Sequence, residues 1–537
     1  MELWEQHYLL FGGGLAVSTL VAVVPILLLL VLLVLRRPAW VAAVAGLVAA
    51  TVLAVGAYGM SGWRTLSAAA YGASFGLFPI TWIVVWALVL YEVNAVSGKF
   101  EVIKASVSSL TTDTRMQALL IGFAFAAFLE GCAGFGTPVA VAAAMMVGLG
   151  FTPLYAASVC LLANTAPVAF GSIGVPVITL AAITGLPVMR LGAAVGRICA
   201  PVALLLPAYL VVATSGWGAA VEVWPALLTC GASFAVTQYV VSNWIGPQLT
   251  DVFSSLAAMG AMGVLLRWWT PRQVRGGVQA ETGVVARRYG VGETVLAWMP
   301  YGLLVGCVLL WSYPAVQRML QVPSVVFAWP GLHDTVMRMP PVVAVAERYP
   351  AMFVLNWLSS AGTACMVAAL SSAVLSGLSV RALGGVVMSV ARRLVRPTVT
   401  VAAMLGMAFE MNYCGATGTL GLAFSTTGGW FPFFSPLMGW LGVFLTGSDT
   451  ASNALFGSLQ TVSAQRLGLD PVLIAAANSA GGVMGKMISL PTIAVAAAAT
   501  EMSLPDQAKL FRFTLRHSLV LAVVTGVEVM LYALAGR

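Results

Sequence analysis

Long apolar runs separated by short polar segments extend along almost the whole chain. In the first half they lie near residues 9–35, 39–57, 72–91, 116–129, 138–150, 153–163, 176–184, 198–214, 223–241 and 249–266. In the second half they lie near residues 294–311, 351–380, 398–426, 431–446, 471–484, 488–500 and 517–535. A membrane-spanning helix needs about 20 apolar residues, so the long runs predict full spans and the shorter ones, broken by Gly and Pro, predict half-spans. We therefore expect an all-α polytopic membrane protein with roughly 12 to 14 transmembrane helices.

The composition excludes the other broad classes of protein. Of the 537 residues, 60% are apolar and 8% are charged, whereas soluble domains are about 45–50% apolar and about 25% charged. A soluble fold and a disordered chain are therefore excluded. The net charge of +8 does not indicate a nucleic-acid partner, because the cations gather in short loops between apolar runs.

Basic loops predict how the chain is oriented in the membrane. Five arginines and one glutamate lie in 267–288, and four arginines without any acid lie in 381–396. Loops of this kind stay in the cytoplasm. Arg36 and Arg37 follow the first apolar run, so that run should end inside and the N-terminus should lie outside.

These loops divide the chain into two transmembrane halves. We expect an N-terminal half at 1–268, a basic cytoplasmic loop at 269–293 and a C-terminal half at 294–537. Within the second half, the segment 312–348 is mixed in charge and rich in Pro and Trp. This loop should face outward, and it could carry a short interfacial helix.

An internal repeat links the two halves. Asn164 lies seven residues before Gly171, and Asn478 lies seven residues before Gly485, each inside a similar Ala-Asn-Thr/Ser-Ala segment. A polar, Gly-rich break lies some 30 residues upstream of each copy. Two similar discontinuous elements, one in each half, are typical of transporters built from inverted repeats, with broken or re-entrant helices and a binding site at mid-membrane.

The break in the first half runs from Glu130 to Pro138 and contains Gly134, Gly136 and Thr137. Glycines and a proline inside an apolar run free backbone N–H and C=O groups, which are tolerated at this depth only where they line a cavity or are buried in protein. A half-helix N-terminus carries partial positive charge that suits a carboxylate. The alternative is a face of small residues that lets two helices pack closely.

Polar side chains also cluster in three further segments, which begin at Asn164, Thr446 and Asn478. Hydroxyl and amide groups at a broken helix could bind a carboxylate and a hydroxyl together, or they could bind Na⁺ through their oxygens. A third possibility is that they only join helices, at about 0.6 kcal/mol for each hydrogen bond. Their occurrence in both halves favours a binding site.

Ionisable residues inside apolar runs are costly and are therefore candidates for function. The clearest are Glu130, Arg197, Glu410, Asp449 and Lys486. The carboxyls could carry protons and the cations could neutralise an anion, although structural ion pairs among them are the alternative. The sequence has neither a nucleophile–base pair nor ligand spacing typical of a metal site, so we expect no enzyme activity, cofactor or metal.

Four strings in these segments resemble the L-lactate permease family: Phe128–Pro138, Asn164–Gly171, Gly439–Thr450 and Gly482–Ser489. The resemblance implies a multi-pass protein of the bacterial inner membrane that imports L-lactate, D-lactate or glycolate by proton symport. It also implies, by analogy, an elevator-type motion.

The sequence departs from the family pattern in three places, which bear on the substrate rather than on the class of transporter. Thr137 stands where the family has Ala, the segment 425–430 lacks a His, and Leu490–Pro491 replaces a Pro-Gln pair.

With this resemblance, the segments combine into a hypothesis for transport. Backbone N–H groups of the two breaks, with Arg197 or Lys486, would hold the substrate carboxylate, and hydroxyls and amides would recognise the 2-hydroxyl. The candidate substrate-binding residues are Gly134, Phe135, Gly136, Thr137, Asn164, Thr165, Arg197, Gly447, Ser448, Thr450, Asn453, Asn478, Ser479 and Lys486.

The candidates for proton coupling are Glu130, Asp449 and Glu410. The partners expected are the substrate, the proton and the lipid bilayer, and a homo-oligomer is compatible with the sequence. The main alternative is a Na⁺-coupled carboxylate transporter of the same architecture. A membrane-embedded enzyme and a purely structural protein are more distant alternatives.

Overall fold

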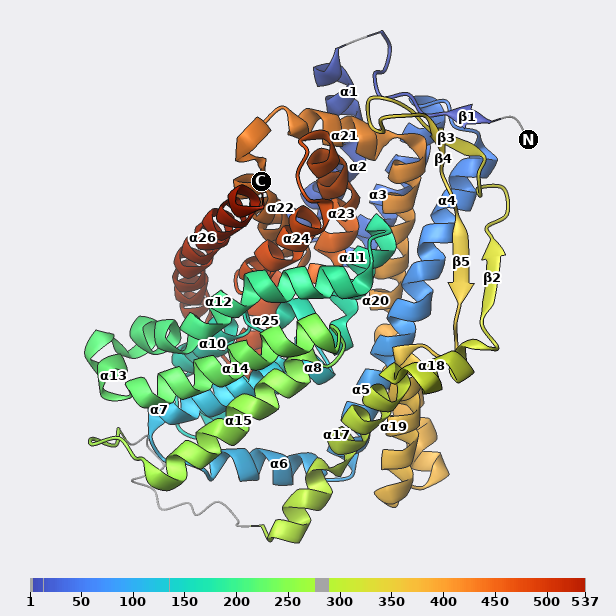
Figure 1. Ribbon diagram of the computed structural model, residues 1–537. Coiled ribbons are helices and arrows are strands. Elements are labelled where there is room, and N and C mark those ends of the chain that lie inside the picture. Colours follow the sequence, from blue (N-terminus) through green and yellow to red (C-terminus); the bar gives the residue numbers. More distant parts are fainter. Residues whose placement is uncertain (1–2, 13, 135, 276–288, 537) are drawn as a thin grey trace.

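The computed structural model describes residues 3–12, 14–134, 136–275 and 289–536, and almost all of its regular structure is helical (Figure 1). The helices of the first half are α1 (Leu15–Ala22), α2 (Val24–Val34), α3 (Ala39–Gly56), α4 (Gly62–Phe75), α5 (Trp82–Val96), α6 (Lys99–Ser108), α7 (Thr114–Gln117), α8 (Ala126–Cys132), α9 (Thr137–Gly148), α10 (Pro153–Ala163), α11 (Gly171–Thr184), α12 (Val188–Ser215), α13 (Trp217–Glu222), α14 (Trp224–Trp244) and α15 (Thr250–Trp268). Those of the second half are α17 (Val291–Ser312), α18 (Pro314–Gln321), α19 (Ala361–Leu375), α20 (Val380–Cys414), α21 (Ala416–Ser425), α22 (Phe431–Thr446), α23 (Asp449–Arg466), α24 (Pro471–Lys486), α25 (Leu490–Ala499) and α26 (Leu504–Ala535). Much of the basic segment expected at 269–293 lies outside the described residues.

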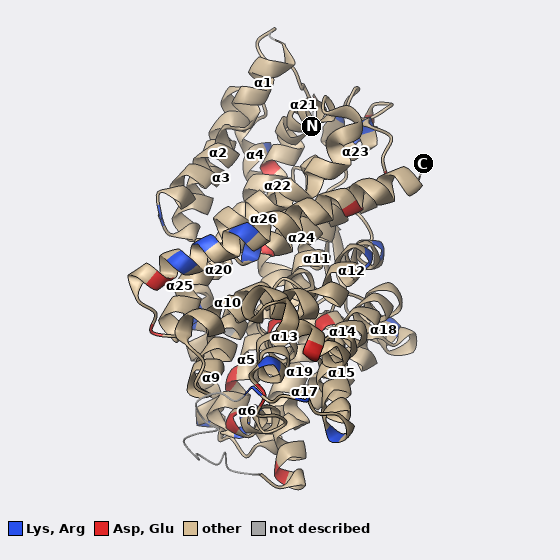
Figure 2. Ribbon diagram, turned by 90° about the vertical axis from the view of Figure 1, so that its left-hand side faces the viewer, with Lys and Arg blue, Asp and Glu red and all other residues tan. Residues whose placement is uncertain are grey.

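The helices confirm an all-α membrane protein. Among the described residues, eight helices are long and apolar enough to cross a membrane, or up to ten if each of two bent helix pairs counts as one span. This is fewer than the 12 to 14 spans expected, because helices such as α9 and α19 are apolar but too short for a full crossing. Figure 2 shows how few charged residues the helices carry.

The segment between α17 and α19 folds into a small cap. It contains the short helix α18 and strands β2 (Val325–Ala328), β3 (Val336–Arg338), β4 (Glu347–Arg348) and β5 (Met352–Leu355). β2 pairs with β5, and β3 pairs with β4 and, in parallel, with the N-terminal strand β1 (Trp4–Glu5). The N-terminal strand, β3 and β4 therefore lie together at one end of the molecule, while β2 and β5 run along its side toward α18 (Figure 1).

The long helix α20 connects the two ends of the molecule. Its first half carries Arg381, Arg392, Arg393 and Arg396, whereas its last turn contacts the N-terminal segment through Gln6, whose Nε2 donates to the carbonyls of Asn412 and Tyr413 at 2.8 Å each. By the positive-inside rule the arginine end is cytoplasmic. The structure thus places the N-terminal cap and the arginines at opposite ends of α20, and that the capped end is external stays a prediction.

Helix breaks in the two halves meet near the middle of the molecule. α8 and α9 are separated by a turn in which Gly134 and Gly136 have φ values of +61° and +81°, and α22 and α23 by Gly447 with φ of +74°. Left-handed backbone of this kind favours glycine, which has no Cβ. α9 packs on α25 and α11 packs on α23, so the two halves are joined at their breaks. That the halves are related as inverted repeats stays a prediction.

Glycines bring α22 and α24 close together. A Cβ on Gly439 would lie 1.8 Å from the Asn478 carbonyl oxygen, and one on Gly481 would lie 1.9 Å from the Pro436 carbonyl oxygen. Small residues allow this approach of transmembrane helices. The close packing holds the polar face of α24 against the start of α23.

Candidate functional site

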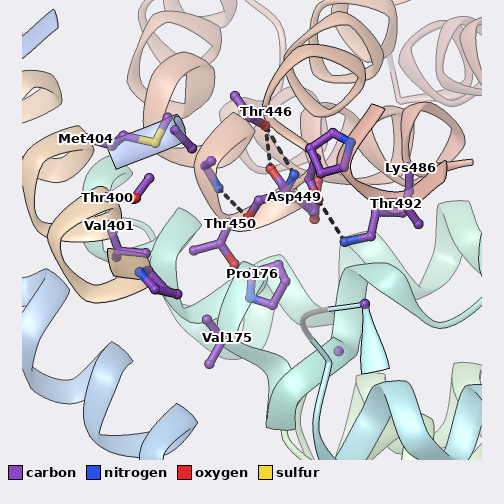
Figure 3. A pocket seen from close by; sticks show the side chains of 18 of the residues that line it. Val175, Pro176, Thr400, Val401, Met404, Thr446, Asp449, Thr450, Lys486 and Thr492 are labelled. Carbon is purple, nitrogen blue, oxygen red and sulfur yellow. Dashed lines mark hydrogen bonds between the residues drawn. The ribbon is translucent and has the colours of Figure 1, made fainter. Parts of the chain in front are cut away.

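A cavity of about 410 Å³ lies where the broken helices meet (Figure 3). This volume is within the usual range of about 300–1,000 Å³ for small-molecule sites. Its polar and charged lining residues are Glu130, Ser172, Arg396, Thr400, Thr446, Ser448, Asp449, Thr450, Lys486 and Thr492. The cavity is thus lined by residues of all four predicted polar segments, together with residues of α20 and α25.

Asp449 is the first residue of α23 and lies 3% exposed at the cavity wall. Its Oδ2 accepts hydrogen bonds from Ser479 Oγ at 2.5 Å and from Asn453 Nδ2 at 3.3 Å. Its Oδ1 has no hydrogen-bond partner among the described residues. One oxygen is therefore held in place, while the other is buried beside Gly482 and has room in its hydrogen bonding for a proton.

A chain of amides lies behind Asp449. Asn478 Nδ2 donates to Asn453 Oδ1 at 2.9 Å, Asn453 Nδ2 donates to the Pro176 carbonyl at 3.2 Å, and Gln460 Nε2 donates to Asn478 Oδ1 at 3.3 Å. All three amide side chains are fully buried and none lines the cavity. They fix the position of Asp449 and join it to α11.

Lys486 is the buried positive charge of the cavity, whereas Arg396 lies at its exposed mouth. Lys486 is the last residue of α24, and its Nζ donates to the Gly447 carbonyl at 2.8 Å across the break before α23 (Figure 3). An ammonium group has three donors, so this contact leaves donors for an anion. The first turn of the 18-residue helix α23 adds backbone N–H groups and the positive end of the helix dipole.

Glu130 also lines the cavity, near the end of α8, and is 4% exposed. A Cβ on Gly171 would come within 2.8 Å of Glu130 Oε1, so the carboxyl packs directly against that backbone. Its Oε2 has no hydrogen-bond partner among the described residues. The Asn164 amide faces this carboxyl, but neither of its polar atoms makes a hydrogen bond of normal geometry there.

The structure adds a carboxyl that sequence reasoning missed. Asp251, the second residue of α15, is 1% exposed, and neither of its oxygens has a hydrogen-bond partner among the described residues. Its Cβ packs against Gly131, and its carboxyl is near enough to Glu130 to interact with it electrostatically. The signal was present in the sequence, because Asp251 lies inside the apolar run 249–266.

The charges of the site do not balance when all carboxyls are ionised. Glu130 and Asp449 line the cavity, Asp251 lies beside Glu130, and all three are buried, whereas Lys486 is the buried cation among the described residues that line the cavity. Leaving a buried charge uncompensated costs on the order of several kcal/mol. A bound anion would add another negative charge, so the arrangement suits the uptake of a proton together with an anion.

Several predicted residues do not reach the cavity. Arg197 lies on an exposed face of α12, where its Nε donates to Asn243 Oδ1 at 3.1 Å. Glu410 lies between α20 and α3, where Thr51 Oγ1 donates to both of its oxygens. Thr165, in the turn after α10, donates to the Leu162 carbonyl at the end of that helix and does not line the cavity.

Other predicted residues lie at the cavity or just behind it. Gly136, Gly447, Ser448, Thr450 and Lys486 line it. Asn453, Asn478 and Ser479 form the support of Asp449, and Gly134 packs beside Ser172. Phe135 and the side chain of Thr137 lie outside the described residues.

Ser172, which belongs to the second predicted polar segment, also lines the cavity, whereas sequence reasoning missed the part of the wall that α20 contributes. Ser172 joins two of the breaks, because its Oγ donates to the Ala133 carbonyl at 3.0 Å. Thr400 and Met404 reach the cavity from α20 (Figure 3). Both are ordinary residues of an apolar helix, and only the packing of α20 reveals their position.

The cavity opens toward the basic end of the molecule. Its outermost lining residues include Pro38, Trp40, Arg396 and Val495, all of them exposed. Pro38 and Trp40 follow Arg37, and Arg396 is one of the arginines of α20, so these three residues belong to the expected cytoplasmic side. The structure therefore has the cavity open to the inside.

Comparison with known proteins identifies a family that the chain matches over nearly its whole length. A profile of the L-lactate permease family matches residues 18–535. The chain is 43% identical to the L-lactate permease of Bacillus subtilis, covering 97% of each chain, and 42% identical to the glycolate permease GlcA of Escherichia coli, covering 99% of this chain and 98% of the relative. Among solved structures, it is similar to the YdaH transporter of Alcanivorax borkumensis, with a TM-score of 0.48, 14% identity and 89% of each chain covered.

Proposed function

Because the chain belongs to the L-lactate permease family, we propose that it imports L-lactate and related short 2-hydroxymonocarboxylates by proton symport. It is a multi-pass protein of the bacterial inner membrane, as its apolar helices and its bacterial relatives support. The observation that carries the site is the cavity in which Asp449 and Lys486 meet at a helix break. The rest of the proposal follows from the chemistry of those groups.

The substrate carboxylate binds between Lys486 and the first turn of α23. Lys486 Nζ lies beside the Gly447 carbonyl and supplies a charge-assisted hydrogen bond. The free backbone N–H groups of a helix N-terminus favour anions. The Thr450 hydroxyl lines the same cavity and recognises the 2-hydroxyl of the substrate. Asn453, Asn478 and Ser479 act indirectly, by holding Asp449.

A proton on Asp449 or Glu130 accompanies the anion. Each of these carboxyls keeps one oxygen without a partner among the described residues, and Lys486 alone cannot balance both carboxylates and a bound anion. The coupling also has an energetic reason. A short carboxylic acid with a pKa of about 4 is ionised at pH 7, and moving its charge inward against an inside-negative potential costs about 2.3 kcal/mol per 100 mV. One proton for each anion removes this cost.

Uptake of L-lactate into proteoliposomes that contain the purified protein tests this function. An imposed pH gradient and an imposed Na⁺ gradient would be compared, with glycolate and D-lactate as competitors. We expect accumulation driven by the pH gradient alone, and inhibition by glycolate. Accumulation that requires Na⁺ would favour the Na⁺-coupled alternative, and no uptake of any of the three acids would contradict the proposed substrate.

A further inference from the structure

A second cavity, of about 230 Å³, lies at the other end of the helices that line the first. α11 contributes Pro176 to the inner cavity and Ile183 to the outer one, and α23 contributes Asp449 and Ser458 in the same way. α20 contributes Met404 and Asn412. With a rise of 1.5 Å for each residue, the two levels are about 10–14 Å apart. The outer cavity therefore lies on the same path, nearer the external end.

Direct contacts between these helices close the path between the two cavities. Ser458 Oγ donates to the Ile183 carbonyl at 2.7 Å, and Asn412 Nδ2 donates to Ser458 Oγ at 2.9 Å. One residue away, a Cβ on Gly457 would lie 2.8 Å from a methyl carbon of Leu180, so α23 and α11 touch without a gap. The floor of the outer cavity is thus a closed barrier made of two side chains and one backbone carbonyl.

The outer cavity is positively charged. Among the described residues that line this cavity, Arg338 is the one with a charged side chain. The Arg338 guanidinium lies 5.2 Å from the centre of the Tyr349 ring, and this ring stacks on Tyr413 with centroids 4.2 Å apart. Arg338 Nη1 also contacts Glu347 Oε1 at 3.1 Å, but the Glu347 side chain is 54% exposed and lines a neighbouring groove instead. An exposed pair of this kind is weak in water, so the guanidinium keeps donors for an anion.

Neutral donors accompany this charge. The Thr417 hydroxyl and the Gln465 amide line the cavity, and neither makes a hydrogen bond with another described residue. A guanidinium that can bind a carboxylate through two N–H groups, with a hydroxyl and an amide beside it, matches the groups of a 2-hydroxymonocarboxylate.

We propose that the outer cavity is a separate binding site for the substrate anion. The anion binds there, on the external side of the Asn412–Ser458 barrier, before the inner cavity becomes accessible. This inference rests on the proposed function for the identity of the anion. Arg338 binds the carboxylate of the anion there, and Thr417 and Gln465 bind its 2-hydroxyl group. Because the site lies outside the barrier, it affects the affinity for external substrate and leaves the affinity for internal substrate unchanged.

Transport from each side of the membrane tests this difference. The variant Arg338→Gln keeps the size of the side chain and removes its charge. L-lactate transport would be measured in right-side-out and in inside-out membrane vesicles. We expect the KM for external lactate to rise about tenfold, the loss typical of a charge-assisted hydrogen bond, with an unchanged KM for lactate at the cytoplasmic face. Equal changes at both faces, or no change at either, would overturn the proposal.

Two variants separate binding from a structural role of the same loop. Arg348→Gln removes the same charge from the next strand, at an exposed position that does not line the cavity, and it should leave both KM values unchanged. Glu347→Gln breaks the ion pair but frees Arg338, so it should lower the external KM or leave it as it is. If Glu347→Gln raised the external KM as Arg338→Gln does, Arg338 would only hold the loop in place, and the proposal would fail.

A labelling experiment tests the site independently of transport. Thr184 lines the cavity, is partly exposed and is not one of the proposed ligands, so Thr184→Cys should react with a membrane-impermeant, anionic methanethiosulfonate added from outside. L-lactate should slow this reaction, and it should not do so when Arg338→Gln is also present. Protection by lactate without any transport would contradict the proposed function and preserve the site. Transport without protection would preserve the function and overturn the site.

Discussion

At the scale of single residues, the site depends on a few buried groups that have no freedom to move. Asp449 is fixed through one oxygen by Ser479 and Asn453, and Glu130 packs against the backbone at Gly171. Each carboxyl packs against a glycine at which a larger residue would not fit: Gly482 for Asp449 and Gly171 for Glu130. The identity of these glycines is part of the transport site.

Replacing Gly482 by Ala tests whether transport depends on the space that this glycine leaves for the Asp449 carboxyl. The new Cβ would lie 2.2 Å from Asp449 Oδ1, and because the other oxygen is held by the amide network, the carboxyl cannot move aside. We expect Gly482→Ala to reduce the rate of lactate uptake more than tenfold while the protein still folds. Gly171→Ala, whose Cβ would lie 2.8 Å from Glu130 Oε1, should have a similar but smaller effect.

Gly302→Ala is the matched control. Gly302 also lies in a helix, and a Cβ there meets no atom within 4 Å. Gly to Ala in a helix is favourable by about 0.5–1 kcal/mol when space allows, so this variant should transport normally and unfold at the same or a higher temperature. A normal rate in Gly482→Ala, measured beside this control, would mean that Asp449 is not confined as described.

The sequence predicts most of these residues but not which of the ionisable residues line the cavity. Glu130, Asp449 and Lys486 are recognisable because ionisable residues in apolar runs are unusual. Arg197 and Glu410 follow the same rule, yet Arg197 faces outward and Glu410 is bound by Thr51 of α3. Which face of a helix a residue occupies depends on packing across hundreds of residues, and no local pattern contains that information.

At the scale of elements, the helix breaks are the features that the sequence locates best. Glycines at 134, 136 and 447 adopt positive φ, and the polar segments around them are the ones that line the cavity. In contrast, the start of α11 could not be predicted. Ser172 and Ile173 have φ values of +47° and +61°, a conformation that costs a β-branched residue energy and that only the surrounding packing can maintain.

A buried ion cluster at the cytoplasmic end joins elements far apart in the sequence. Arg115 and Asp113 are each 1% exposed, with Arg115 Nη2 and Asp113 Oδ2 2.9 Å apart, and Arg115 Nη1 contacts Glu222 at 2.6 Å. Arg115→Met would leave Asp113 buried without its main partner, so we expect the free energy of unfolding to fall by about 3–5 kcal/mol. The double variant Asp113→Asn with Arg115→Met should lose less. Unfolding in detergent at pH 7 measures both, and equal losses would contradict the pairing.

The same cluster predicts a dependence on pH. Burial acts to raise the pKa of Asp113, but hydrogen bonds from the Arg115 side chain and the Arg275 backbone outweigh it and lower the pKa below its ordinary value of 3.8. A carboxyl with a lowered pKa stabilises the fold at neutral pH, and this contribution disappears as the pH falls below about 4. The unfolding temperature of Asp113→Asn should therefore depend less on pH between 5 and 3 than that of the unmodified protein. Identical acid dependence would contradict the assignment.

At the scale of the whole molecule, one path contains two cavities and a single closed barrier. The inner cavity opens beside Arg396 and Trp40, and the outer cavity lies under the loop that carries Arg338. The arginines predict the orientation of the chain, and the structure brings the basic ends of α2 and α20 together at one cavity. The presence of the outer cavity was not, since it forms where the N-terminal strand, the loop and three helices meet.

This asymmetry predicts which side of the membrane reaches the inner cavity. Thr400 lines it and is partly exposed. Thr400→Cys should react with an impermeant thiol reagent faster in inside-out than in right-side-out vesicles, and L-lactate should slow the reaction. Equal rates from the two sides would contradict an inward-open structure.

The central claim is that a carboxyl of the inner cavity carries a proton with each substrate anion. The most direct test counts protons and lactate together, with a pH-sensitive dye trapped in proteoliposomes and labelled lactate outside. For the unmodified protein and for Glu410→Gln, whose carboxyl lies outside the cavity, we predict one proton for each lactate. For Asp449→Asn or Glu130→Gln we predict exchange of lactate without accompanying protons in at least one of the two. Full proton coupling in both variants would contradict the account.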